Sequence, residues 1–480
     1  MVFSSLLFVF CFLPLNLIFY FAAKGIKSKN TVMLVFSLIF YAWGEPLYIL
    51  LLLFMTFVDW FLTIKIEENE GIYKRRRLLI ALTVAINLTL LAVFKYGTFL
   101  LRNLNIVSGF PSVVPKIALP IGISFYTFQL LTYCVDVYRG KVPAQRSFAT
   151  LLLYVSMFHQ CIAGPIVRYS DICDELIDRK TSYQDIYDGI RRFSTGLFKK
   201  ALLANICAEI VSKLLVAEGT DMSVLKSRSV LSLWIGVLAF SLQIYLDFSA
   251  YSDMAIGMGK MIGIHYCENF DFPYISSSVS EFWRRWHISL GNFFKDYVYI
   301  PLGGSRKGKL RTVLNLFIVW ALTGLWHGAA WNFVLWGIYF FIFISLEKLF
   351  LGKLLKKVPV VSHIYLILVV YFGWILFKFE NLSDILTVLK GMFGLNSNKF
   401  SDFETLTAIK SYAVIIVFCI ICCTPVFKKL SQKLTQLALT SKTAMAAYTV
   451  IDIALPIALV FLSVTALVGS TYNPFLYFRF

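Results

Sequence analysis

Histidine is the side chain best suited to proton transfer near neutral pH, and this sequence contains only five. His327 lies in WALTGLWHGAAWNF, and His287 lies in SEFWRRWHISLGNFFKDYVYIPLGG. The pKa of imidazole is close to neutrality, so a histidine can take a proton from a hydroxyl nucleophile. His327 and His287 are therefore candidate catalytic residues. His159, in FHQCIAGPI, is a polar insertion in an apolar run and is predicted to line a passage.

His327 is predicted to lie at the tip of a helical hairpin with arms 312–326 and 329–347. Basic residues stand at both feet of this hairpin: Lys307, Lys309, Arg311, Lys348, Lys353, Lys356 and Lys357. Positive charge favours the cytoplasmic side, which places the tip roughly 20–25 Å from that edge of the membrane. An ionisable group at such depth costs free energy and indicates function, with a neutral histidine bonded between helices as the alternative. Gly324 and Gly328 would allow a substrate to approach closely.

The residues around His287 carry charge. Residues 281–297 are predicted to form one amphipathic helix that lies at the membrane interface or lines a cavity, as are residues 184–205. In the first of these segments Arg284, Arg285 and Trp286 precede His287, and Lys295 and Asp296 follow it. A basic cluster of this kind could bind a phosphorylated donor, or it could anchor the helix to lipid headgroups.

Four polar residues lie at the end of an apolar span in the motif QIYLDFSAYSD: Gln243, Asp247, Ser252 and Asp253. Acidic groups at that depth face a cavity or pair with a cation. A proton relay would use the same residue types. This motif by itself therefore does not distinguish a transporter from an enzyme.

The composition is that of a polytopic membrane protein. Of the 480 residues 59% are hydrophobic and only 15% are charged, against about 25% in soluble domains. The formal net charge of +18 comes from basic residues in short connectors, where they set membrane orientation, so nucleic-acid binding is not indicated. The nine cysteines include no metal-ligand pattern. We expect an all-α protein with about ten to twelve transmembrane helices among the segments 2–22, 31–43, 47–64, 78–94, 117–134, 147–165, 229–248, 312–326, 329–347, 362–377, 411–427 and 446–468.

The chain is expected to form a single membrane domain, 1–480, with N-terminal helices (1–165), a catalytic core region (166–347) and C-terminal helices (348–480). The basic run 74–77 predicts a cytoplasmic connector, and therefore an outward N-terminus. Between 165 and 310 the charges do not define the side of the membrane.

Several motifs resemble the membrane-bound O-acyltransferase (MBOAT) family and, within it, the bacterial alginate O-acetyltransferase branch. The resembling segments are EFWRRWHISLGNFFKDYVYIPLGGSRKGK, ALTGLWHGAAWNFVLWG, FHQCIAGPIVRYSDI, QIYLDFSAYSDMAIG, LPIGISFYTFQLLTYCVDVYRG and the terminal NPFLYFRF. The resemblance implies a ring of transmembrane helices around a central funnel or tunnel, with a histidine near its constriction. That histidine corresponds to His327, and the second family position corresponds to His287. Trp326 would line the tunnel beside them.

The resemblance also implies an activity. The chain would move an acyl group, acetyl above all, from a cytoplasmic thioester such as acetyl-CoA to hydroxyls of an envelope or secreted polysaccharide. Transfer would be direct or through an extracytoplasmic acetyltransferase partner, and the protein would lie in the bacterial cytoplasmic membrane. No bound cofactor or metal is expected. Two alternatives stay open: D-alanyl transfer toward teichoic acid, and a transporter of a glycan or acyl donor that forms no bond.

Overall fold

The structure is a computed structural model that describes residues 1–108, 117–217, 219–469 and 475. Helices dominate these residues, and β-pairing is limited to one isolated antiparallel bridge between Phe270 and Trp286. The chain divides into two compact units, 1–193 with 252–268, and 194–251 with 269–480. Each unit is described by itself below.

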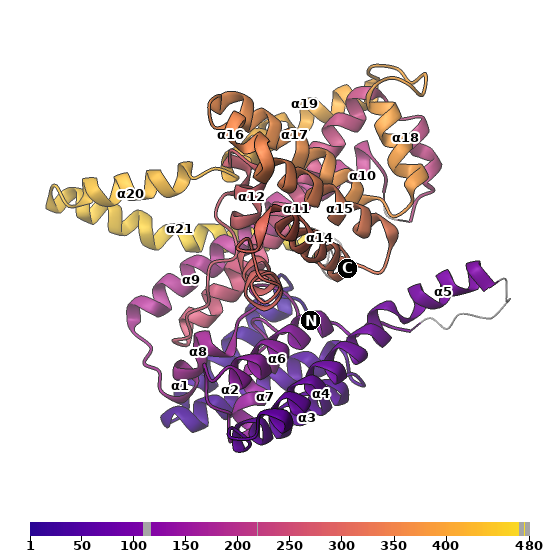
Figure 1. Ribbon diagram of the computed structural model, residues 1–480. Coiled ribbons are helices and arrows are strands. Elements are labelled where there is room, and N and C mark those ends of the chain that lie inside the picture. Colours follow the sequence, from indigo (N-terminus) through magenta and orange to yellow (C-terminus); the bar gives the residue numbers. More distant parts are fainter. Residues whose placement is uncertain (109–116, 218, 470–474, 476–480) are drawn as a thin grey trace. The chain divides into compact units, whose positions relative to one another are not determined.

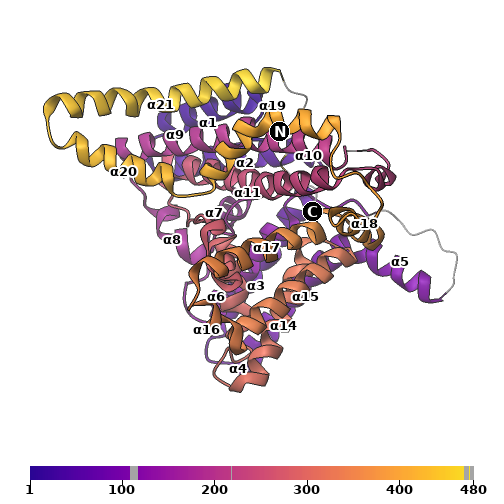
Figure 2. The same ribbon diagram turned by 90° about the horizontal axis from the view of Figure 1, so that it is seen from above.

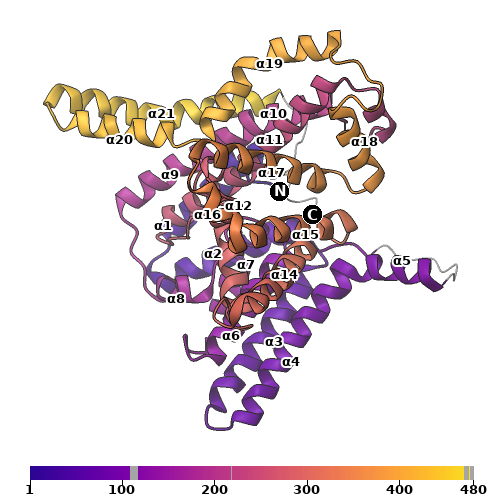
Figure 3. The ribbon, with the colours of Figure 1, turned by 45° about the horizontal axis from the view of Figure 1, so that its top comes forward.

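The first unit is built mainly from the N-terminal helices (Figure 1). Buried polar contacts join neighbouring helices here, because a polar group in an apolar interior needs a partner. The amide of Asn87 donates to both carboxylate oxygens of Asp59 at 2.9 Å, and this contact links the two helices that lie side by side in Figure 3. Its helices are α1 (Leu13–Ala22), α2 (Gly25–Gly44), α3 (Ile49–Glu68), α4 (Tyr73–Leu91), α5 (Gly97–Ser108), α6 (Ile123–Tyr138), α7 (Phe148–Ser156), α8 (Tyr169–Ile177) and most of α9 (Tyr183–Phe198).

The second unit contains both candidate catalytic histidines. Its last two helices form an antiparallel pair, drawn in yellow in Figure 2. Its helices are α10 (Asn205–Leu214), most of α11 (Val230–Met261), α12 (Val279–Arg285), α13 (Ile288–Phe294), α14 (Gly308–His327), α15 (Trp331–Leu346), α16 (Gly352–Leu355), α17 (Pro359–Lys378), α18 (Leu382–Met392), α19 (Phe403–Cys422), α20 (Val426–Ala438) and α21 (Lys442–Val468).

Short irregular helical turns complete the two units. Two are 3₁₀ turns, η4 (Met222–Lys226) and η5 (Pro273–Ile275). The π-helical turns are η1 (Phe8–Phe12), η2 (Ala92–Tyr96), η3 (Lys199–Ala204), η6 (Lys295–Tyr299) and η7 (Glu347–Leu351).

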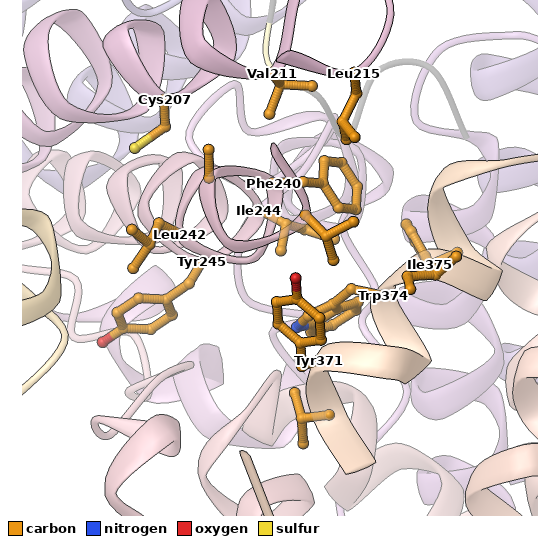
Figure 4. Close-up of a cluster of buried hydrophobic side chains, with 14 of the residues drawn as sticks. Cys207, Val211, Leu215, Phe240, Leu242, Ile244, Tyr245, Tyr371, Trp374 and Ile375 are labelled. Carbon is orange, nitrogen blue, oxygen red and sulfur yellow. The ribbon is translucent and has the colours of Figure 1, made fainter. Parts of the chain in front are cut away.

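The core of the second unit forms where α10, α11 and α17 pack together (Figure 4). Val211 of α10, Phe240 of α11 and Trp374 of α17 are almost completely buried. The hydroxyl of Tyr371 donates to the carbonyl oxygen of Trp234 at 2.6 Å, so its polar end is satisfied inside this apolar cluster. The core holds α11 and α17 together, and both helices contribute side chains to the site described below.

Eight helices within the described ranges are long and apolar enough to cross a membrane. The chain is therefore a multi-pass membrane protein, as its composition indicated. About ten to twelve crossings were expected, and the difference lies in the shorter N-terminal segments. The eight helices span Ile49–Glu68, Tyr73–Leu104, Val230–Met261, Gly308–His327, Trp331–Leu355, Pro359–Lys378, Phe403–Cys422 and Lys442–Val468.

Segment 147–165 was predicted to cross the membrane, but its helix is too short to do so. Only Phe148–Ser156 is helical, and nine residues at a rise of about 1.5 Å cannot cross a hydrocarbon layer about 30 Å thick. The chain then continues without regular helix through Cys161 and Gly164. The segment 2–22 is likewise shorter than expected, since its helical part runs from Phe8 to Ala22.

Candidate active site

His327 lies at the tip of the predicted hairpin. Helix α14 ends at His327, and α15 begins four residues later at Trp331. The imidazole is 5% exposed, and its ring centroid lies 4.9 Å from that of Trp336 and 5.3 Å from that of Phe377. Both contacts are edge-to-face, which fixes the ring orientation. Side chains of α15 and α17 therefore hold this histidine in place.

The two glycines beside His327 have a different role from the one that the sequence suggested. They were expected to admit a substrate, but their open sides face α15. A Cβ added to Gly328 would lie 2.2 Å from the ring of Phe333, and one added to Gly324 would lie 2.4 Å from the carbonyl oxygen of the same residue. These glycines allow the two arms of the hairpin to pack closely.

His287 interrupts the segment predicted as one amphipathic helix over 281–297, so that prediction was wrong. Helix α12 ends at Arg285, and α13 begins at Ile288. Between them His287 has φ 47° and ψ 55°, a left-handed conformation that is costly for a residue with a Cβ. Backbone strain of this kind persists only where neighbouring contacts enforce it, and it is often found at functional sites. The second amphipathic prediction, 184–205, is confirmed as α9 continued by η3.

Uncharged side chains contact His287 on several sides. Its Nδ1 lies 3.2 Å from Oδ1 of Asn269 and 3.4 Å from Oγ of Ser289. The rings of Phe248 and Trp326 pack on the imidazole, with centroids 4.7 and 5.7 Å away. Burial lowers the pKa of His287 to about 3, so the ring is neutral over the physiological range.

Trp326 connects the two histidines. Its indole centroid lies 5.7 Å from the ring of His287 and 5.0 Å from the ring of His327. Trp326 is 4% exposed and belongs to the last turn of α14. The two imidazoles therefore share one aromatic neighbour in the same buried cluster, although 40 positions separate them in the sequence.

The WRRW motif contributes an aromatic wall to this cluster. Trp283 lies 5.3 Å from Trp336, and Trp286 lies 4.9 Å from Trp374. Trp336 in turn contacts His327. Stacked and edge-to-face rings exclude water and leave few rotamers, so the wall makes the site both dry and rigid.

The charged residues near His287 lie at the border of the aromatic cluster. Arg284 and Lys295 are exposed, and Asp296 is partly buried. Arg285 makes ion pairs with Glu281 at 2.9 Å and Asp271 at 3.3 Å, so its charge is already balanced.

Asp247 forms a buried ion pair, which is one of the two settings that its motif left open. Its Oδ1 lies 2.6 Å from Nζ of Lys200, and both side chains are 3% exposed. Gln243, one helical turn earlier on α11, is partly buried. Lys200 lies 47 positions before Asp247, so local sequence patterns do not predict this pairing.

Three other predicted site residues, His159, Ser252 and Asp253, belong to the first unit. His159 is 1% exposed, and its Nδ1 lies 3.2 Å from the hydroxyl of Tyr266. Burial, and then the charge of Arg179, lower its pKa to about 3. Asp253 pairs with Arg192 at 2.7 Å.

Two residues that hold the motifs in place were missed by the sequence analysis. Asn269 contacts His287 as described, and Glu347 binds the start of α12. The Glu347 carboxylate accepts from the backbone N–H of Val279 at 2.6 Å and from the backbone N–H and hydroxyl of Ser280 at 2.9 and 2.6 Å. Glu347 lies in the turn after α15, so it ties the helix pair that carries His327 to the helix that leads to His287. The sequence contains one sign of this role: Glu347 is a charged residue at the end of an apolar run.

Over the described residues, no group of three or more His, Cys, Asp or Glu side chains could hold a metal ion. The chemistry that the arrangement supports is proton transfer by neutral imidazole in a water-poor, aromatic environment. In such an environment a thioester would be protected from hydrolysis while a hydroxyl is deprotonated.

Comparisons with known proteins identify the family of the chain. The sequence model of the membrane-bound O-acyltransferase family, MBOAT, matches residues 141–387. The chain is 35% identical over 508 aligned residues to the "Probable alginate O-acetylase" of Azotobacter vinelandii, with 100% of both chains covered. It is 34% identical to the "Peptidoglycan O-acetyltransferase" of Helicobacter pylori, covering 82% of this chain and 80% of that one. The "Teichoic acid D-alanyltransferase" of Bacillus subtilis is 26% identical over 48% of this chain and 59% of its own length.

Proposed function

Since this chain belongs to the membrane-bound O-acyltransferase family and is an O-acyltransferase, we propose that it acetylates hydroxyls of a cell-envelope or secreted polysaccharide. One observation carries the proposal. The histidines of both family motifs lie in one buried aromatic cluster and share Trp326 as a neighbour. The names of full-length relatives, an alginate O-acetylase and a peptidoglycan O-acetyltransferase, support a polysaccharide acceptor.

In the proposed reaction His327 acts as general base. It takes the proton from the acceptor hydroxyl as the oxygen attacks the thioester carbonyl carbon. The C–O bond forms, the C–S bond breaks, and the leaving thiolate receives the proton from the imidazolium. His287 accepts a hydrogen bond from a neighbouring hydroxyl of the acceptor and so orients the acceptor. A base of this kind contributes about 10²–10⁴-fold to the rate. A covalent acyl intermediate on the path is compatible with the same residues.

The donor is a thioester on the cytoplasmic side. Acetyl-CoA fits this role, because it is an acetyl thioester that carries phosphate groups. Its phosphates would interact with Arg284 and Lys295, whose side chains are exposed, more readily than with Arg285, whose charge is balanced by two carboxylates. The acyl group would cross the cytoplasmic membrane through a passage between the transmembrane helices. It would reach the polysaccharide directly or through an extracytoplasmic acetyltransferase.

The proposal is tested with purified protein in proteoliposomes, with acetyl-labelled thioester outside and a polysaccharide or soluble glycan acceptor inside. His327→Ala should lower turnover by at least about 10²-fold while the melting temperature stays near that of the wild type. His363→Ala is the matched control, because this imidazole is exposed and its Nδ1 lies 2.8 Å from the carbonyl oxygen of Ser276. Wild-type transfer by His327→Ala would contradict the proposal.

D-alanyl transfer toward teichoic acid is the second candidate, favoured by the partial similarity to the Bacillus subtilis protein. The same proteoliposomes distinguish the two cargoes when D-alanyl thioester on a carrier protein replaces the acetyl donor. Acetylation is contradicted if only D-alanine reaches the acceptor.

A transporter that forms no bond is less compatible with the site. Its proton-coupling groups would be Asp247 and Asp253, and each carboxylate is already paired with a cation. Label that becomes covalently attached to the acceptor supports the enzyme. Label that crosses while still attached to its donor supports the transporter.

A further inference from the structure

Asn269 lies at the centre of the contacts that hold His287. Its side-chain oxygen lies 3.2 Å from Nδ1 of His287, 2.8 Å from the hydroxyl oxygen of Ser289 and 3.3 Å from the backbone nitrogen of Ser289. Asn269 itself is completely buried, at 0% exposure. An asparagine in such a setting is expected to orient a neighbour by hydrogen bonding.

The orientation of the Asn269 amide follows from one of these contacts. The backbone N–H of Ser289 can only donate, so the atom that faces it must be an acceptor. The oxygen therefore points toward Ser289 and His287, and the NH₂ group points away. The oxygen and the nitrogen of an amide differ in their hydrogen bonds, and these partners define which end is which.

The protonation of His287 follows in turn. Because the Asn269 oxygen only accepts, the imidazole nitrogen that contacts it must carry the hydrogen. In a neutral imidazole one nitrogen carries the proton and the other carries the lone pair. We propose that Asn269 is a positioning residue that holds His287 with its proton on Nδ1, so that Nε2 accepts a hydrogen bond from a hydroxyl of the acceptor next to the reacting one. The effect of this tautomer on acyl transfer rests on the proposed function. The contact between Asn269 and His287 does not depend on it.

The main chain around this contact is also fixed. The N–H of Ile288 donates to the carbonyl oxygen of Asn269 at 3.0 Å, and Phe270 pairs with Trp286 in the antiparallel bridge. These bonds enforce the left-handed conformation of His287 and prevent its ring from turning away. Phe248 of α11 and Trp326 of α14, which pack on the imidazole, carry no charge, as is true of Asn269 and Ser289.

The first test is a direct measurement on the wild-type protein. With only five histidines, ¹⁵N-histidine labelling gives a simple spectrum in which a protonated and a lone-pair nitrogen have different chemical shifts. The His287 signals are assigned by their loss in His287→Ala. We expect a neutral ring protonated at Nδ1. A proton on Nε2, or a mixture of the two forms, would overturn the inference without any variant at Asn269.

The second test uses variants at Asn269. Asn269→Leu keeps the volume but removes the acceptor, and kcat should fall about 10- to 100-fold, as for other residues that orient a functional histidine. Asn269→Asp retains an acceptor oxygen and should restore kcat to within several-fold of the wild type. A loss of the same size in both variants would mean that the acceptor oxygen is unimportant, which would overturn the inference.

A double-mutant cycle separates positioning from a general structural effect. If Asn269 acts through His287, then Asn269→Leu should cause no further loss of turnover in the His287→Ala background. An equal loss in both backgrounds would overturn the inference. Wild-type turnover by His287→Ala alone would instead contradict the proposed role of His287, and the measured tautomer would still stand. Melting temperatures of all variants, followed by tryptophan fluorescence, show whether each is folded.

Discussion

Gly324 of α14 and Gly337 of α15 lie directly against each other in the hairpin that carries His327. A Cβ on Gly337 would lie 3.2 Å from Cα of Gly324 and 2.4 Å from the carbonyl oxygen of Trp320. The backbones of the two helices therefore approach more closely than any other residue pair would allow. This contact sets the distance between His327, at the end of α14, and Trp336, the neighbour of Gly337 on α15.

The first prediction concerns this contact. Gly337→Ala should separate the two helices and lower the free energy of unfolding by about 1–3 kcal/mol, as is typical of overpacking. Acyl transfer should fall with it, because the Trp336 ring moves relative to His327. Thermal unfolding and turnover are the measurements. Gly71→Ala is the control, since an added Cβ there meets nothing within 4 Å. Equal stability and turnover of the two variants would show that neither the fold nor acyl transfer needs the close approach of the two helices.

A second prediction concerns Glu347, which accepts the N–H groups of Val279 and Ser280. Glu347→Ala leaves buried donors without their acceptor, at a cost of about 1–3 kcal/mol for each. The start of α12 should loosen, and acyl transfer should fall through His287. Glu347→Gln retains one carbonyl oxygen, so its stability and its rate of acyl transfer should lie between those of Glu347→Ala and the wild type. Lys348→Ala, an exposed neighbour bonded to the Tyr299 hydroxyl, is the control and should change little.

The third prediction concerns the buried pair of Lys200 and Asp247. Lys200→Met should lower the free energy of unfolding by about 3–5 kcal/mol, because the carboxylate is left buried without its cation. The double variant Lys200→Met with Asp247→Leu should recover most of this loss and retain acyl transfer, since the pair is structural. As a control, Lys213→Met breaks the exposed pair with Glu209 and should cost at most about 1 kcal/mol. A folded double variant without activity would instead give these charges a part in the reaction.

The fourth prediction concerns the pH dependence of stability that His265 gives to the first unit. A hydrogen bond from Nδ1 to Glu175 at 2.7 Å raises the pKa of His265, with a smaller contribution from Asp185. Because the pKa is higher in the folded protein, the interaction stabilises the fold most below the ordinary histidine pKa of about 6.5. The stabilisation is lost as the pH rises through the raised value. Melting temperatures of the wild type and His265→Gln should therefore differ most at about pH 5.5 and converge at alkaline pH. A difference that is constant with pH would exclude this ion pair as its cause.

The sequence by itself determined the class of the protein and the position of one candidate catalytic histidine. Apolar runs separated by basic connectors predict a polytopic membrane protein, because burial in lipid depends on local composition. The paired arms around WHG placed His327 at a helix tip, and α14 and α15 confirm that placement. The motifs also pointed to the family, since the residues that carry the resemblance are contiguous. The terminal NPFLYFRF lies outside the described residues except for Phe475, which packs on Tyr251 and Lys200.

Only the tertiary structure decided how the motifs are held and what breaks the helix at His287. Asn269 and His287 are 18 positions apart, Lys200 and Asp247 are 47 apart, and Glu347 is 68 positions from Val279. Helical periodicity describes neighbours three or four positions apart, so it contains no information about such contacts. The amphipathic pattern of 281–297 runs unbroken in the sequence, but the distant Asn269 accepts hydrogen bonds from the backbone of Ile288 and Ser289, and these hold a left-handed residue within it. Side chains brought together by folding, and not local propensity, determine which nitrogen of His287 carries the proton.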